Sequence, residues 1–154
     1  MAHDQRDNDV TTRRILDELQ GDGRLSLAEL GRRVGLSPPA VAERVQRLER
    51  DGVITGYSAR IDPAGVGRAL DAYIDVRLLP TTDSGEFERR VARLDSVREV
   101  AFLTGRFDFQ LRVACRDADD LNATVRAIRR DAGAAGTETR IVLRSTTFDR
   151  APVG

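Results

Sequence analysis

The chain has 154 residues, which suits one domain of ordinary size or two small ones, and its 25 basic residues, all arginine, balance 25 acidic ones. The single cysteine, Cys115, and the single histidine, His3, exclude a disulfide within the chain and a zinc site built from several such ligands. We expect a soluble, cytoplasmic protein, because the sequence has neither a long uncharged apolar run nor a basic-then-apolar leader. We also expect no cofactor and no metal.

Two hydrophobic periods divide the chain. From Thr11 to about Gly52 the apolar residues recur at steps of three and four, the period of a helix. From about Leu70 onward, alternating stretches interrupt two further helical stretches. Between them, one proline and two glycines mark a connector. The sequence therefore predicts a disordered tail over 1–10, a first domain over 11–60, a linker over 61–69 and a second domain over 70–150.

Capping signals predict three short helices in the first domain. The first helix is expected to start at Thr11 or Thr12. Ser26 and Glu29 form a capping box at the start of the second. Ser37 is the expected N-cap of the third, with a proline next to it, where the missing N–H has no effect on the helix. Helices joined by a short glycine-containing turn are typical of a helix-turn-helix.

The third helix and its neighbours carry a local excess of positive charge. Residues 30–50 include five arginines and two acids. A solvated helix face is the simplest interpretation, but the capped helix pair favours DNA binding. In the major groove, side chains on the outer helix face would contact thymine methyl groups (Pro39 and Ala40), a cytosine amino group (Glu43), and guanine or phosphate (Arg44). The expected phosphate contacts are those of Arg32, Arg33, Ser37, Arg47 and Arg60. Residues 53–61 read as strand, turn and strand, which predicts a winged variant.

The second domain reads as β-α-β-β-α-β. Strands are expected over 70–79, 97–103, 107–115 and 139–148, and helices after the capping residues Asp83 and Asp117. This order is that of the ferredoxin-like fold, in which both helices cover one face of an antiparallel sheet. The chain as a whole is therefore predicted to be an α+β protein.

The other face of this sheet is left open in such a fold. We expect a second copy of the chain to cover it, because its predicted apolar residues are too many for a solvated face. A dimer also suits DNA binding, since it sets two helix-turn-helix units roughly 34 to 36 Å apart. The residues expected to make this face apolar are Tyr73, Leu79, Ala101, Leu103, Ala114 and Val142.

The loop after the second strand contains Gly105 and Asp108. Glycine permits backbone conformations that other residues resist, and an aspartate in a loop bonds backbone amides or meets a cationic group. By spacing alone, this segment is a turn and nothing more.

A set of motifs in order carries a family resemblance over residues 8–148. The motifs are Arg13-Arg14-Ile15-Leu16, Leu36-Ser37-Pro38, Arg44-Val45-Gln46-Arg47-Leu48-Glu49 with Gly52-Val53-Ile54, Asp62-Pro63, and Gly105-x-x-Asp108-Phe109. Together they resemble the leucine-responsive regulatory protein/AsnC (Lrp/AsnC) family of prokaryotic transcription regulators. Gly31 stands where this family commonly has alanine; it lowers helix propensity by about 1 kcal/mol but allows close helix packing.

The resemblance implies a winged helix-turn-helix that binds double-stranded DNA. It also implies a ferredoxin-like (RAM or ACT-like) domain that assembles dimers, and often octamers or other higher oligomers. Small effectors, usually amino acids, are held between dimers near the Gly-x-x-Asp loop. Carried over to this chain, the effector-binding residues are Thr104, Gly105, Arg106, Phe107 and Asp108. Asp108 either binds the ammonium group of the effector or only braces the loop.

Two alternatives stand beside a ligand-gated regulator. The first is an architectural DNA-binding protein without an effector. The second is an enzyme, since sirohaem decarboxylases resemble this family in architecture. Such chemistry needs a positioned proton donor or metal ligand. We expect His3 to lie in the tail and Cys115 in the core, so neither residue supplies one.

Overall fold

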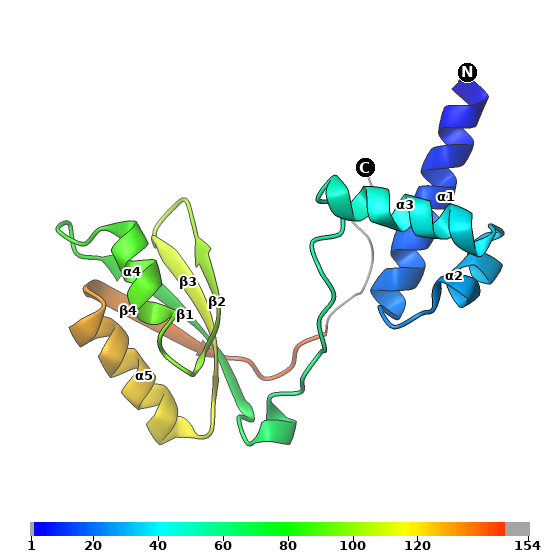
Figure 1. Ribbon diagram of the computed structural model, residues 1–154. Coiled ribbons are helices and arrows are strands. Elements are labelled where there is room, and N and C mark those ends of the chain that lie inside the picture. Colours follow the sequence, from blue (N-terminus) through cyan, green and yellow to red (C-terminus); the bar gives the residue numbers. More distant parts are fainter. Residues whose placement is uncertain (1, 147–154) are drawn as a thin grey trace. The chain divides into compact units, whose positions relative to one another are not determined.

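The structure is a computed structural model that describes residues 2–146, with side chains from residue 10 onward (Figure 1). Contacts between residues divide the chain into two compact units. The described part of the first runs to Arg60 and includes Thr146, and the second covers Ile61–Ser145.

The described part of the first unit consists of helices α1 (Ala2–Gly21), α2 (Leu27–Val34) and α3 (Pro38–Arg50). Helix α1 starts at Ala2, so the prediction that the first helix starts at Thr11 or Thr12 was wrong. The physical reason lies in the sequence, since residues 2–10 contain neither proline nor glycine and nothing there breaks a helix that has been nucleated downstream.

The caps of α2 and α3 follow the sequence prediction. The hydroxyl of Ser26 accepts a hydrogen bond from the backbone N–H of Glu29 at 3.1 Å, and that of Ser37 accepts one from Ala40 at 3.4 Å. Gly35 ends α2 in the left-handed conformation, with φ at +76°. The helices enclose a core of buried side chains, namely Ile15, Leu30, Val34, Val41, Val45 and Leu48.

Gly31 allows the close packing expected of it. It is buried, and a Cβ atom built on it would lie 2.6 Å from the backbone oxygen of Leu36 in the turn between α2 and α3. Real Cβ contacts are essentially never that short. The glycine therefore lets the turn fold back against its own helix.

The predicted wing is not formed as strands. Described residues 53–61 contain no strand, although the backbone N–H groups of Val53 and Ile54 both donate to the carbonyl of Leu48 and close the end of α3. The hydroxyl of Tyr57 donates to Glu49 at 3.0 Å and holds the segment further along. A short two-stranded hairpin has little stability of its own, which explains why the strand pattern does not produce a strand pair here.

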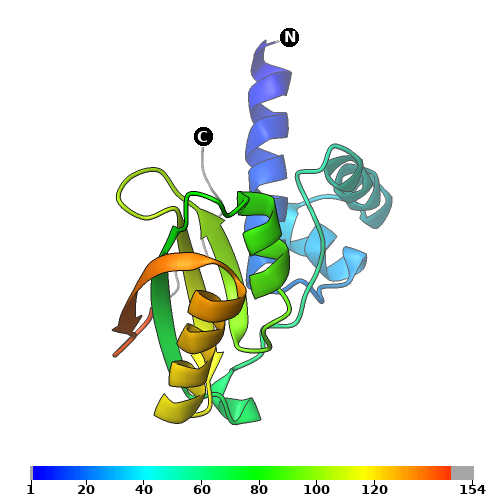
Figure 2. The same ribbon diagram turned by 90° about the vertical axis from the view of Figure 1, so that its left-hand side faces the viewer.

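The second unit has the predicted ferredoxin-like order. Its elements are β1 (Leu70–Leu78), α4 (Ser84–Val91), β2 (Val97–Phe102), β3 (Phe109–Cys115), α5 (Ala118–Asp131) and β4 (Ala134–Ile141), with a short 3₁₀ turn, η1 (Ala64–Val66), before them. The strands form one antiparallel sheet in the order β2-β3-β1-β4. Helices α4 and α5 lie on the same face of this sheet (Figures 1 and 2).

The last strand departs from its predicted range of 139–148. It runs from Ala134 to Ile141, and Phe148 lies outside the described residues. Gly133, with φ at +83°, turns the chain directly from α5 into β4. Alanine and glycine are poor strand residues, so the start of β4 is set by pairing with β1 rather than by local preference.

The core of the second unit lies between the helices and the sheet. Phe87 and Val91 of α4 and Leu121 and Ile128 of α5 pack on the inward side chains of β1 and β3. Cys115 is fully buried there, as predicted, and burial raises the pKa of its thiol. Such a thiol is a core residue rather than a nucleophile.

The open face of the sheet carries paired charged side chains beside its apolar ones. Arg112 forms a two-point ion pair with Asp71 on the neighbouring strand, at 2.8 and 3.2 Å, and lies over the ring of Tyr73. Asp75, only 5% exposed, accepts hydrogen bonds from Gln110 and from Arg140. Of the apolar residues predicted for this face, Ala114 is buried, whereas Leu79 and Leu103 are 44% and 40% exposed. Exposed apolar side chains therefore remain on this face, and its coverage by a second copy stays a prediction.

Candidate DNA-binding surface and ligand-binding loop

Helix α3 presents its predicted outer face to solvent. Val41, Val45 and Leu48 are buried beneath it. On the other side, the side chains of Ser37, Pro39, Glu43 and Arg47 are exposed, and those of Ala40 and Arg44 are half-buried. Since residues three and four apart share a helix face, one surface combines the capped start of α3 with polar, charged and small side chains. A helix of this kind fits the width of a major groove.

On this face, the positive charge of Arg47 is only weakly paired with a carboxylate. Arg47 lies 3.6 Å from Asp51, and both side chains are mostly exposed, at 70% and 58%. Such a pair contributes little to stability, so phosphate can replace its carboxylate at low energetic cost. Arg60, another candidate on this unit, is exposed at the end of the segment that follows α3.

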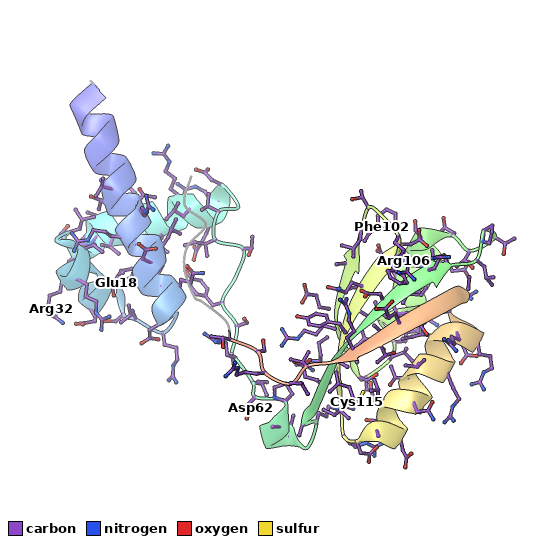
Figure 3. The ribbon with its side chains drawn as sticks, turned by 180° about the vertical axis from the view of Figure 1, so that it is seen from behind. Glu18, Arg32, Asp62, Phe102, Arg106 and Cys115 are labelled. Carbon is purple, nitrogen blue, oxygen red and sulfur yellow. The ribbon has the colours of Figure 1, made fainter. Side chains whose placement is uncertain are left out.

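Arg32 and Arg33, both predicted to contact phosphate, are paired with carboxylates of the chain in this structure. Arg32 holds Glu29 with two hydrogen bonds, of 2.6 and 3.0 Å. Arg33 bonds Glu29 at 2.9 Å and Glu18 of α1 at 2.8 Å, and thereby ties α1 to α2. Figure 3 labels Glu18 and Arg32, which lie on these two helices. The hydrogen bonds from Arg32 and then Arg33 lower the pKa of Glu29 to about 2. The sequence signal that we missed is the i, i+3 and i, i+4 spacing of the two arginines from Glu29.

The loop between β2 and β3 is braced by Asp108. Its carboxylate accepts a hydrogen bond from the backbone N–H of Leu78 at 2.8 Å, and its backbone N–H donates to Val76 at 2.9 Å. Its carbonyl accepts from Leu103 and closes the loop. Gly105, with φ at +115°, supplies the turn. Of the two roles left open by the sequence, bracing of the loop is the one that this geometry supports.

A hollow of about 260 Å³ lies beside this loop. The guanidinium carbons of Arg106 and Arg77 lie 5.1 and 6.0 Å from the ring centre of Phe107. Thr104, Gly105 and Asp108, though predicted, do not line the hollow, whereas β1 and β4 contribute residues that were not predicted. The complete lining is Arg77, Arg106, Phe107, Ala135, Gly136, Thr137 and Glu138.

The described part of the chain contains no group of three or more His, Cys, Asp or Glu side chains placed to hold a metal ion. It also contains no helix that is both long and apolar enough to cross a membrane.

A helix-turn-helix unit followed by a ferredoxin-like unit with a hollow at its loop defines a DNA-binding regulator with a ligand-binding domain. Comparison with known proteins agrees with this class. Residues 8–55 match the family model for winged helix-turn-helix DNA-binding, and residues 71–152 match that for the Lrp/AsnC ligand binding domain. The chain belongs to the Lrp/AsnC family of transcriptional regulators.

Curated relatives cover most of the chain. An uncharacterized HTH-type transcriptional regulator of Pyrococcus furiosus is 43% identical over 76% of this chain and 77% of its own length. The HTH-type regulator AldR of Mycobacterium tuberculosis is 39% identical over 87% of this chain and 76% of its own. The leucine-responsive regulatory protein of Escherichia coli is 39% identical over 73% of this chain and 70% of its own.

Solved structures show the same architecture. A transcriptional regulator of Neisseria meningitidis in complex with L-Met has a TM-score of 0.85 and 29% identity, over 90% of this chain and 92% of that one. The feast or famine regulatory protein of M. tuberculosis complexed with L-methionine has a TM-score of 0.86 and 34% identity, over 95% of this chain and 99% of that one.

Proposed function

We propose that this chain is a cytoplasmic, sequence-specific DNA-binding regulator whose DNA binding responds to a small effector, an amino acid, bound by the second unit. The observation that carries the DNA-binding part is the outer face of α3, which is exposed and rests on a packed, capped helix pair. Pro39 and Ala40 suit thymine methyl groups, Glu43 suits a cytosine amino group and Arg44 suits guanine or phosphate.

DNA binding is tested by an electrophoretic mobility shift titration across salt concentrations. Phosphate contacts release counterions, so the affinity of the full chain for duplex DNA is expected to fall steeply with salt. Absence of binding to any duplex at low salt would overturn this part of the proposal.

An amino-acid effector is supported by the two similar proteins that were solved with L-methionine. The hollow at the loop offers what an amino acid needs, namely cations for a carboxylate and, in Glu138, an acceptor for an ammonium group. Thermal-shift screening against the twenty amino acids is the direct test, because a ligand of the native state raises its apparent stability. If none of the twenty amino acids raises the melting temperature, the alternative of an architectural DNA-binding protein without an effector is favoured.

A homodimer that assembles further, to an octamer or another higher oligomer, completes the proposal. A dimer presents two copies of α3 to half-sites about one helical turn apart, roughly 34 to 36 Å, and the effector then lies between dimers. Light scattering coupled to size exclusion measures this assembly, and a molecule that stays monomeric at all concentrations would contradict it.

We propose a binding protein rather than an enzyme. Cys115 is fully buried, which removes it from chemistry at the surface. A haem-type absorbance spectrum of the purified chain would instead support the decarboxylase alternative.

A further inference from the structure

The hollow beside the β2–β3 loop differs from the rest of its sheet in how its arginines are paired. On the same sheet face, Arg112 is paired with Asp71 and Arg140 with Asp75. Within the described residues, Arg77 and Arg106 have no carboxylate within ion-pair distance and lie over the ring of Phe107 instead. Two guanidinium groups that stay unpaired while their neighbours are neutralised are typical of an anion-binding site.

The hollow has one acidic side chain, Glu138 on β4. In the pairing of β1 with β4, Glu138 lies opposite Asp75 and Gly136 lies opposite Arg77. Glu138 is therefore two positions along β4 from the residue that faces Arg77. With the two arginines, Glu138 leaves the lining one positive charge in excess. Arg77 comes from β1, Arg106 from the β2–β3 loop and Glu138 from β4, so the hollow combines two cations and one acceptor from three parts of the unit.

Gly136 keeps the hollow open. A Cβ atom added there would meet no atom within 4 Å, so the space above β4 opposite Arg77 is empty. Phe107, a half-buried side chain, also lines the hollow and supplies an apolar surface there. A short aliphatic stem can therefore lie against the ring while its polar ends reach the charged groups.

We propose that this hollow binds an acidic amino acid, L-glutamate or L-aspartate, in preference to a neutral one; this rests on the proposed function, in which the second unit binds an amino acid. The two carboxylates pair with Arg77 and Arg106, the ammonium group with Glu138, and the methylene stem packs on Phe107. The ligand's single net negative charge matches the excess positive charge of the lining. A neutral amino acid leaves one guanidinium without a partner.

Isothermal titration calorimetry on the full-length protein tests this preference with size-matched ligands. L-glutamate is compared with L-glutamine, and L-aspartate with L-asparagine, because each pair differs in one charge. The members of each pair differ by one ion pair, and an exposed ion pair contributes a factor of a few. The acidic member is therefore expected to bind about threefold to fivefold tighter at low salt, and the difference is expected to shrink as salt rises. Equal affinity within each pair overturns the inference.

Substitutions test which side chain of the hollow pairs with which charged group of the ligand. Arg77→Gln and Arg106→Gln are each expected to reduce the preference for the acidic ligand, whereas Arg126→Gln, an exposed arginine on α5, leaves it unchanged. Glu138→Gln is expected to weaken the binding of L-glutamate but not that of 2-oxoglutarate, because 2-oxoglutarate has no ammonium group. Gly136→Val is expected to fold, since its side chain enters empty space, and to block both ligands. An acidic preference that survives both arginine variants places the site elsewhere and contradicts the inference.

The same titrations separate this inference from the proposed function. Tight binding of L-leucine or L-methionine with weak binding of the acidic amino acids overturns the charge preference and leaves an amino-acid effector in place. Failure of every amino acid to bind overturns both. Binding of the acidic amino acids, with loss in the Arg77→Gln and Arg106→Gln variants, supports both.

Discussion

The carboxylate of Asp108 accepts a hydrogen bond from the backbone N–H of Leu78 at 2.8 Å, and so ties the β2–β3 loop to the end of β1. The bond joins positions thirty residues apart and is partly buried. The same end of β1 carries Arg77, which lines the hollow with Arg106 of the loop. The Asp108–Leu78 hydrogen bond therefore fixes the position of the loop that carries Arg106 relative to the end of β1 that carries Arg77.

Replacing Asp108 tests this brace. Asp108→Ala leaves the partly buried N–H of Leu78 without a partner and is expected to lower the free energy of unfolding by about 1–3 kcal/mol in urea denaturation. Asp108→Asn keeps an acceptor oxygen and is expected to retain most of the stability. Equal losses in both variants would show that the negative charge, rather than the bond to Leu78, is what the loop needs.

The pairing of Glu29 predicts a pH dependence. Its pKa falls from 4.5 to about 2 on folding, because Arg32 and Arg33 donate to the charged form. A lowered folded pKa contributes stability that is present above pH 4.5 and is lost as the pH falls from about 4.5 towards 2.

Thermal melts of wild type and Glu29→Gln over this pH range measure the effect. The variant is expected to melt lower than wild type at pH 7 and to lose less stability on acidification. Asp17→Asn, an exposed carboxylate on α1, serves as control and should follow the wild-type profile. Parallel pH profiles for wild type and Glu29→Gln would contradict the assignment.

Close packing at Gly31 gives a third prediction. Gly31→Ala places a Cβ atom 2.6 Å from the backbone oxygen of Leu36, so the turn must shift. Overpacking of this kind typically lowers stability by about 1–3 kcal/mol, which exceeds the gain of about 1 kcal/mol in helix propensity. Gly21→Ala, where the added atom meets nothing within 4 Å, is the matched control and is expected to be neutral or stabilising. If urea denaturation finds Gly31→Ala as stable as wild type, the turn moves away from the added Cβ atom without a cost in free energy, which contradicts the prediction.

The elements that the sequence predicted well are those set by local chemistry. Ser26 and Ser37 cap their helices because a hydroxyl can reach the first free N–H groups whatever the rest of the chain does. Asp83 and Asp117 cap α4 and α5 in the same way. The alternation of β1 and β3 also fixed which side chains face the core, since a strand shows opposite faces with period two.

The elements that it missed depend on partners distant in sequence. The start of β4 at Ala134 is set by pairing with β1, and without that register Glu138 and Arg77 cannot be placed in one hollow. Likewise, the polar character of the open sheet face comes from cross-strand pairs such as Arg112 with Asp71, and residue counting cannot reveal such pairs. Motif resemblance pointed to the loop but not to the strands that complete the hollow.

The central claim is that the exposed face of α3 binds DNA, and fluorescence anisotropy of a labelled duplex titrated with the protein at several salt concentrations tests it most directly. Arg44→Gln and Arg47→Gln are each expected to weaken binding and to reduce the slope of log affinity against log salt by about 1, while Arg126→Gln leaves both unchanged. Affinity and slope that stay at wild-type values in both α3 variants would contradict the account.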